Sequence, residues 1–299
     1  MAGFTSMDDF IQEATVNGKF YRADWNKNML PTTAAVAGEW SCLANGGGNP
    51  AAGTIYNSGT NLAFQATSDS TAGAGGILHG GNVSTDTKHI VNASAFSAAA
   101  TTMPAVMMLI DLLGFYRVTS VTTTGNQATD NTVTLPRYTS GAGVQAFAFV
   151  NSTTAMGAAT PNLSITYTDQ DGNTGATTPT TLPSCKTAAA NGLILYSGTG
   201  SGKYGPFIPL ASGDSGIRAI TQINLSASYV SGTLSVALCK PLITMPMTTI
   251  GVAAERDFLN QVPSLPRVYD GANLHWLIYH GAATPVNSAF YGHLDFAWG

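Results

Sequence analysis

The chain has 299 residues, of which 44% are hydrophobic and only 9% are charged, with a formal net charge of −4. An average soluble domain carries about 25% charged residues, so Thr, Ser, Asn, Gly and Ala must supply most of this surface. The 12 Lys and Arg residues form no cluster, which excludes a groove that neutralises nucleic-acid phosphates. Such a surface can be buried against neighbours without desolvating many ions, and it predicts a component of a large assembly.

The N-terminal segment and the cysteines indicate where the chain folds. Acidic residues stand where a secretory signal would be basic and apolar, and the longest apolar run, residues 103–113, contains Asp111 and is too short to cross a bilayer. We therefore expect folding in a cytoplasm, without membrane insertion. Cys42, Cys185 and Cys239 have neither disulfide nor zinc spacing, and we expect buried free thiols.

Three helices are predicted. Residues 6–15 begin with Ser6 as a cap and have two acidic residues in the first turn, where they complement the helix dipole. Residues 102–114 are apolar nearly all round and end at a glycine, a pattern that indicates a buried central helix. Residues 253–261 form the third, short helix. Residues 36–97 are dense in small and polar residues, and we expect ordered long loops packed on the rest of the protein or on a neighbour.

Most of the remaining sequence alternates small or polar with large apolar residues, which is the period of a half-buried strand. Strands are predicted at residues 145–150, 163–168, 217–229, 234–242, 274–279 and 288–298. Turns rich in Gly, Asn and Asp separate them without β-α-β alternation. The predicted fold is mainly β: an antiparallel β-sandwich, jelly-roll-like, with a few short helices and long Gly/Ala/Ser/Thr-rich loops.

The sandwich is assigned to residues 121–299. Residues 1–120 then supply the N-terminal helix, the small-residue loops and the buried helix, all packed on the sandwich. The two parts could form one continuous domain.

Several segments imitate catalytic motifs but lack essential residues. Residues 213–216 copy the nucleophile loop of trypsin-like proteases, yet no histidine occurs in a recognisable base motif, and a tight turn before a strand explains them. Residues 197–204 resemble a phosphate loop, but the required first Gly and last Ser or Thr are replaced and no helix can follow. Residues 46–51 lack dinucleotide-site spacing. We expect no enzyme activity and no cofactor.

Two groups of residues could in principle hold a metal ion. Residues 169–173 carry oxygen-bearing side chains that could hold calcium, but the segment follows a predicted strand and its Asp-Gly pair favours a hairpin. The histidines show no i, i+4 helical pair. His275, His280 and His293 could approach one another across adjacent strands, although core and rim roles are commoner. We predict no metal site.

Aromatic residues concentrate in the last two predicted strands. The commoner role for such residues is the sandwich core, because aromatic side chains bury large areas. The alternatives are subunit contacts or a sugar-stacking face made by Trp276, Tyr279 and Trp298. The candidate interface residues are Trp276, Tyr279, Phe290, Tyr291 and Trp298.

Segments of the C-terminal half resemble structural virion proteins of tailed bacteriophages. The likeness is carried by residues 162–173 with the Thr- and Pro-rich residues 177–183, by residues 232–242, and by residues 264–271 and the final Phe-Ala-Trp-Gly. It implies a structural component of the particle, in the head shell, without enzyme activity. The sequence does not resemble the major shell subunit, with its long charged helix and extended arm. With the major shell subunit set aside, the resemblance implies an auxiliary role, as a decoration, cement or vertex protein.

Two functions are therefore expected, both in a virion assembled in the host cytoplasm. The first is a capsid-associated structural protein, a symmetric oligomer with a trimer favoured, that contacts other virion proteins such as the major capsid protein. The second is a tail, neck or fibre-associated protein that binds a host-surface glycan. A glycan hydrolase would need paired carboxylates in a cleft, and the 16 acidic residues lie mostly in turns or helix starts.

Overall fold

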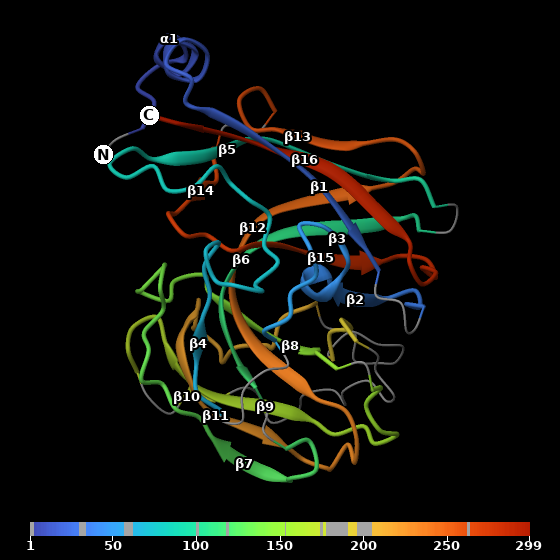
Figure 1. Cartoon of the computed structure of the whole chain (residues 1–299). Helices are drawn as coiled ribbons and strands as arrows, with labels where there is room; N and C mark the ends of the chain where they lie inside the picture. Colours follow the sequence, from blue (N-terminus) through green and yellow to red (C-terminus); the bar gives the residue numbers. More distant parts are fainter. Residues whose placement is uncertain are drawn as a thin grey trace.

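The described residues of the computed structural model fold into three antiparallel sheets with one short α-helix, α1 (Met7–Ile11) (Figure 1). The mainly β, antiparallel fold is thus confirmed, whereas a jelly-roll connectivity is not established. The structure describes residues 3–29, 34–56, 62–99, 102–117, 120–152, 154–173, 176–177, 191–195, 205–261 and 264–299. No helix in these ranges is both long and apolar enough to span a membrane.

The first sheet contains the first and last strands of the chain and is called the terminal sheet. Its strands run in the order β13 (Ala254–Asp257), β5 (Lys88–Ser97), β16 (Ala289–Trp298), β1 (Phe20–Asn28) and β3 (Gly48–Asn49), and β14 (Arg267–Val268) also pairs with β5. β16 is held between β1 and β5 along its length.

The second sheet lies in the middle of the molecule and is called the central sheet. Its order is β2 (Glu39–Cys42), β15 (Leu274–His280), β6 (Ala105–Arg117), β12 (Leu234–Met247) and β8 (Gln145–Val150), with β4 (Gln65–Ala66) on β6. The distal sheet has the order β10 (Ala176–Thr177), β9 (Leu163–Asp169), β11 (Ile217–Leu225) and β7 (Gly125–Ala128). Both the terminal and the central sheet take strands from either side of residue 120.

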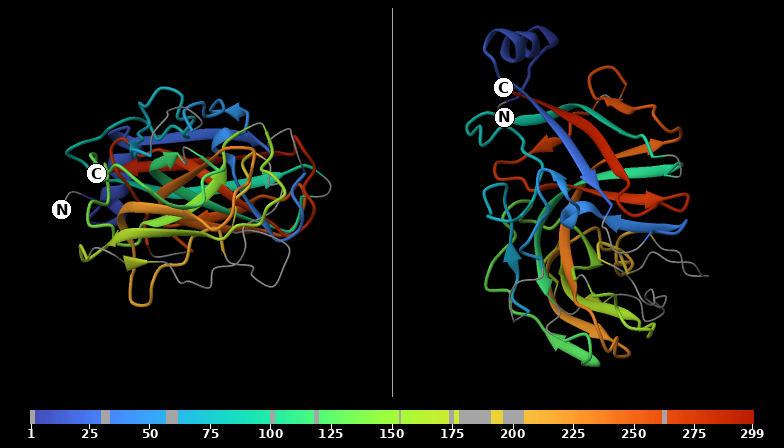
Figure 2. Two further views of the ribbon diagram at one scale, coloured as in Figure 1. Left: turned by 90° about the horizontal axis from the view of Figure 1, so that it is seen from below. Right: turned by 45° about the vertical axis from the view of Figure 1, so that its right-hand side comes forward.

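The long strands β6 and β12 connect the two ends of the molecule (Figures 1 and 2). Their pairing shifts register twice, and such bulges bend a strand pair. At one end the central sheet faces the terminal sheet, where Trp276 lies 5.2 Å from Trp25 between ring centroids. At the other end it meets the distal sheet, where the Ile220 amide donates to Tyr116 Oη at 3.1 Å.

The central sheet is buried on both faces, which explains the largest error of the sequence prediction. Leu109 of β6 belongs to the core shared with the other sheets, while Ile110 faces a second cluster covered by loop residues such as Tyr56 and Ile194. Residues 102–114 were predicted as a helix, yet 105–117 form strand β6. An apolar run without polar alternation fits a strand covered on both sides as well as a buried helix.

Of the other two predicted helices, one is confirmed and one is wrong. Helix α1 is confirmed: Ser6 Oγ accepts the Asp9 amide at 3.1 Å, and the helix continues as a wider turn over Gln12–Val16. The prediction for residues 253–261 was wrong, because 254–257 pair with β5 as β13. The Asp257 carboxylate then caps a turn by accepting the Leu259 and Asn260 amides.

The six strands predicted from alternation all occur, with β11 ending at Leu225 and β12 extending to Met247. Residues 36–97 do contain long loops packed on the central sheet, but they also form β2 to β4 and the ten-residue β5, which the composition concealed. Strand β1 was not predicted either. Residues 169–173 form the expected hairpin turn, with Gly172 at φ +86° and its amide donating to the Asp169 carbonyl.

Replacing Gly292 tests the close packing of β16. A Cβ atom there would stand 1.9 Å from the Ser94 carbonyl oxygen, which is backbone of β5 and cannot move aside. We expect Gly292→Ala to lower the free energy of unfolding by about 1–3 kcal/mol or more. Gly47→Ala is the control, because a Cβ at Gly47 meets nothing within 4 Å. Equal stability of the two variants in urea denaturation would contradict this packing.

Candidate functional site

The aromatic residues chosen as interface candidates do not share one face. Trp276 and Phe290 are 1% and 0% exposed, so their assignment as interface residues was wrong and the core role applies. Tyr279 packs on Trp40 at 5.5 Å on the central sheet. Because Trp276 points into the core, the sugar-stacking face of Trp276, Tyr279 and Trp298 does not form.

The two remaining candidates lie on the terminal sheet. Tyr291 is 37% exposed and stacks on Phe96 with centroids 5.4 Å apart. Trp298 is partly exposed, and the Lys88 ammonium lies 5.2 Å from its ring centroid. They occupy different parts of β16, and neither touches the other.

Buried cations are the most distinctive polar feature of the structure. Lys27 is 2% exposed, and its Nζ donates to the carbonyl oxygens of Gly46, Ala51 and Gly75 at 3.2–3.3 Å. Burial lowers the pKa of Lys27 to about 8, which still leaves most of it charged at neutral pH. One ammonium group therefore ties together three glycine- and alanine-rich loop segments.

Arg137 makes a second tie. Its guanidinium donates through Nε and Nη2 to the two carboxylate oxygens of Asp111 at 2.8 and 2.7 Å, and through Nη1 to the Thr67 carbonyl at 3.0 Å. Both side chains are nearly inaccessible. The two parallel hydrogen bonds neutralise the Asp111 carboxylate within the apolar strand β6, and the bond to the Thr67 carbonyl holds Thr67 on that strand.

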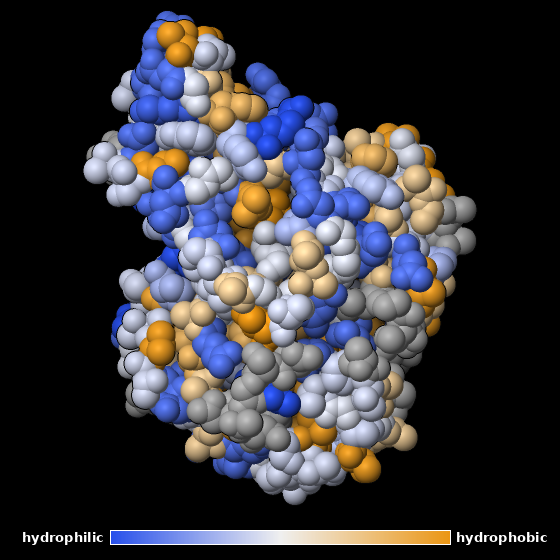
Figure 3. All heavy atoms as spheres, in the orientation of Figure 1, coloured by the Kyte–Doolittle hydropathy of each residue, from blue (hydrophilic) through white to orange (hydrophobic). Residues whose placement is uncertain are grey.

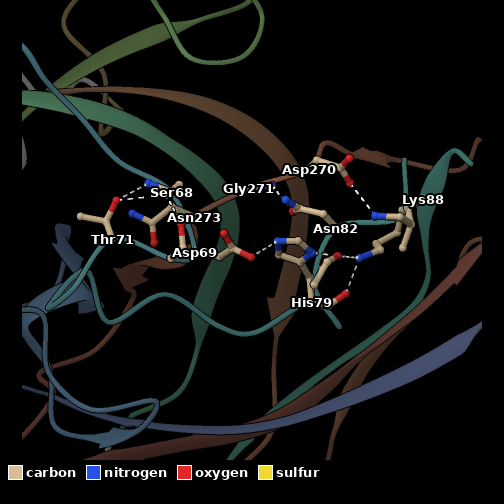
Figure 4. Close-up of polar contacts among 12 residues, drawn as sticks. Ser68, Asp69, Thr71, His79, Asn82, Lys88, Asp270, Gly271 and Asn273 are labelled. Carbon is tan, nitrogen blue, oxygen red and sulfur yellow. Dashed lines mark hydrogen bonds and ion pairs between the residues drawn. The ribbon is translucent and has the colours of Figure 1, made fainter. Parts of the chain in front are cut away.

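Lys88, His79 and Asp69 form the third tie (Figure 4). Lys88 Nζ donates to His79 Nδ1 at 3.0 Å, to the His79 carbonyl at 2.7 Å and to the Gly81 carbonyl. Because Nδ1 accepts from the ammonium, Nε2 carries the proton and faces Asp69 Oδ2 at 3.2 Å. All three hydrogens of the Lys88 ammonium are donated to acceptors within the protein. The series Asp69–His79–Lys88 therefore resembles a catalytic relay, but its role is structural.

A cleft of about 710 Å³ opens beside these ties, lined by residues 83–88, 136–140 and 267–270. It lies between the terminal sheet and the loop before β8, where Figure 3 shows a notch in the left-hand outline. Asp270 closes one wall by accepting the Val83 and Ser84 amides at 2.9 and 3.2 Å. Buried cations at its inner side and exposed polar groups at its rim make this cleft our candidate functional site.

The segments that imitate catalytic motifs have structural roles where they are described. Residues 213–216 lead into β11 as a turn, and Tyr167 Oη donates to Asp214 there. Residues 197–204 and Cys185 lie outside the described residues. Cys42 and Cys239 are buried free thiols, and burial raises the pKa of Cys42 to about 12.

The three C-terminal histidines have separate partners. His275 Nε2 meets Tyr56 Oη at 3.1 Å, and His280 contacts Ser41 and Thr284. His293 lies on β16, in the terminal sheet. Within the described ranges no three His, Cys, Asp or Glu side chains are grouped so that they could hold a metal ion.

Two features of the sequence indicate these buried charged groups, although the sequence predictions did not include them. In β1, Lys27 stands in phase with the inward residues Ala23 and Trp25, so alternation alone placed a lysine on the buried side. Asp111 interrupts an apolar run, and a buried carboxylate requires a partner. No comparable signal marks the cleft, because its three segments are far apart in the chain.

No family model matches the chain, and no curated protein matches it in sequence. Among solved structures, the crystal structure of the infectious bursal disease virus VP2 subviral particle is similar with a TM-score of 0.21 and 9% sequence identity, covering 99% of this chain and 84% of that chain. A similarity at this level establishes neither a shared fold nor a shared function.

Removing the Lys88 ammonium tests the third tie. Lys88→Met leaves the buried His79 carbonyl and the partly exposed Gly81 carbonyl without their donor, and we expect a loss of about 3 kcal/mol in unfolding free energy by urea denaturation. The control is Lys19→Met, because Lys19 makes its ion pairs with Glu13 and Asp86 at a partly exposed position and should matter little. Similar losses in both variants would refute a special role for Lys88.

Buried histidines predict that stability falls in mild acid. Burial, aided by the charge of Lys27, lowers the pKa of His275 to about 3, and burial also lowers the pKa of His79 and of His89. The unfolded chain binds these protons near pH 6.5, whereas the folded protein binds them only at lower pH. The free energy of unfolding should therefore decrease as pH falls below 6.5, by up to about 1.4 kcal/mol per pH unit for each group.

The measurement is urea denaturation at a series of pH values between 7 and 4. His275→Gln should reduce the slope of stability against pH, because it removes a buried group that takes up a proton when the chain unfolds. A stability that stays flat or rises from pH 6.5 to 4 would contradict the burial of neutral histidines.

Proposed function

We propose that the protein is a structural component of a virion: an auxiliary capsid protein of a tailed phage, of the decoration, cement or vertex type. The observation that carries the proposal is the scarcity of charge on its surface. Only 9% of the residues are charged, and several of these are buried: Lys27, Glu39, Lys88, Asp111, Arg137, Asp169 and Asp295. The surface is left to neutral, small and polar side chains.

This surface suits permanent contact with other proteins. Covering Thr, Ser, Asn and Ala side chains desolvates few ions and immobilises little side-chain entropy. The molecule also exposes apolar side chains around its projecting end, where Met7, Ile11, Val16 and Phe20 lie on and after α1 (Figure 3). A stable contact would bury about 1,000 Å² or more, and neutral interfaces of that size would stiffen a shell without chemistry.

The proposed partners are other virion proteins, the major capsid protein first among them, and further copies of the chain in a homo-oligomer, with a trimer favoured. We propose neither enzyme activity nor a cofactor, and no direct contact with nucleic acid or membrane. Assembly would occur in the host cytoplasm.

Neutral interfaces predict that binding to the shell depends little on salt. The affinity of the purified protein for shells that lack it should change less than about threefold between 0.05 and 0.5 M NaCl, because screening acts on charges. Co-sedimentation at each salt concentration measures this. A fall of about tenfold or more with salt would show that charged groups drive the contact.

Copy number in purified virions tests the proposal directly. Hundreds of copies per particle, by quantitative gel or mass spectrometry, support a shell role, whereas about a dozen or fewer indicate a tail position, because symmetry fixes how many equivalent sites each part offers. A low count would favour the alternative, a tail, neck or fibre-associated protein that binds a host-surface glycan. Complete absence from the particle would overturn both.

A further inference from the structure

The cleft between residues 83–88, 136–140 and 267–270 has the size and composition of a ligand site. Its volume of about 710 Å³ falls within the range of roughly 300–1,000 Å³ that small-molecule sites occupy. Three chain segments that are far apart in the sequence meet there. Two of them are held together by hydrogen bonds that Asn82 and Asp270 accept: the Gly271 amide donates to Asn82 Oδ1 and the Val83 amide to Asp270 Oδ1, each at 2.9 Å (Figure 4).

One side of the cleft carries an aromatic and cationic wall. The rings of Tyr138 and Tyr269 meet edge to face with centroids 4.8 Å apart. The guanidinium of Arg267 lies 4.2 Å from the centroid of Tyr269. Arg267 is exposed and, among the described residues, forms no ion pair. Its donors are therefore available to a ligand beside an aromatic ring.

Tyr138, in this wall, has a strained backbone and an unpaired buried hydroxyl. Its φ of +52° lies in the left-handed region, which costs energy for a bulky side chain. Its Oη is buried, and no described residue forms a hydrogen bond with it. Backbone strain and an unpaired buried hydroxyl persist where the surrounding structure imposes them, and such residues gather at ligand-binding sites.

The charges of the cleft argue against a phosphate ligand. Lys88 and Arg137 line it, but their donors are engaged by internal carbonyls, His79 and Asp111. Asp86 is paired with Lys19. Apart from Arg267, the rim offers Asp270 and the hydroxyls of Ser and Thr residues at 84, 85, 87, 139 and 140. This mixture favours a neutral ligand with many hydroxyl groups.

We propose that the cleft binds a saccharide, with the C–H face of a sugar ring against Tyr269 and Tyr138 and sugar hydroxyls bonded to Arg267 and Asp270. Tyrosine suits this role because it presents an apolar face and a polar end. The site differs from the aromatic residues first considered on β15 and β16. It does not rest on the shell role, because a saccharide site could serve a protein on the head or on the tail.

Binding of the full chain to a glycan array tests the proposal. The probes are bacterial lipopolysaccharide, capsule, teichoic acid and peptidoglycan oligosaccharides, and each sugar bound is then titrated by calorimetry. Tyr269→Ala and Arg267→Ala should each weaken binding about tenfold or more, which is the loss of one good contact. Tyr269→Phe keeps the ring and should retain most of the affinity.

Tyr291→Ala is the matched control, because Tyr291 is an exposed tyrosine that does not line the cleft, and it should bind like the wild type. Thermal melting of each variant verifies folding, and the exposed Arg267 makes Arg267→Ala the variant least prone to misfold. The proposal is overturned if no sugar on the array binds, or if binding survives both cleft variants. It is also overturned if the cleft variants lose binding to a peptide from the shell subunit while no sugar binds.

Discussion

The loops between β1 and β5 depend on buried cations that collect backbone carbonyl oxygens. Lys27 binds carbonyls of three loop segments, Lys88 binds the turn at residues 79–81, and Arg137 holds Thr67 on β6. This region has few large apolar side chains, so burial alone would not offset the conformational entropy lost on ordering it. Hydrogen bonds to charged donors contribute about 1.5–3 kcal/mol each, and here they replace the missing hydrophobic contacts.

The same loops complete the central sheet. Its outer face carries Ile110, Phe147, Phe149 and Leu277, which would be exposed if the loops did not cover them. Tyr56 and Ala44 from the loop region lie in that cluster, and Tyr56 Oη donates to the Ala74 carbonyl within the same region. The cations thus hold the loops, and the loops keep water from the sheet, so the polar ties and the apolar core stabilise each other.

The burial of charged side chains also makes the surface of the molecule more neutral. Lys27, Lys88, Asp111 and Arg137 are buried in internal hydrogen bonds and ion pairs. A chain that is already poor in charged residues therefore exposes even fewer of them. That surface is the basis of the proposed role in an assembly. The cleft lies where the ties meet the surface, since Lys88 and Arg137 form its inner side. Internal hydrogen bonds of Lys88 and Arg137 therefore hold the inner side of the cleft in place, as a preorganised site requires.

Local patterns in the sequence were sufficient for the strands in which small or polar residues alternate with large apolar ones, whether one face is buried, as in β9, or both, as in β8. Alternation placed β8, β9, β11, β12, β15 and β16, and Ser6 with its acidic neighbours placed α1, because these signals depend only on nearby residues. Composition alone indicated a protein whose surface becomes interface. The Asp-Gly turn after β9 followed from backbone preference in the same way.

Tertiary structure decided everything that depends on contacts between distant segments. Residues 105–117 became a strand because both of their faces are covered, and residues 254–257 became one because β5 offered an edge. Trp276 lies in the core because Trp25, 251 positions earlier, packs against it. The cleft unites three segments that no local pattern relates. The sequence by itself determined the strands that alternate small or polar with large apolar residues, helix α1 and the scarcity of charge. Long-range packing and hydrogen bonding determined the other strands, which charges are buried and where a ligand could bind.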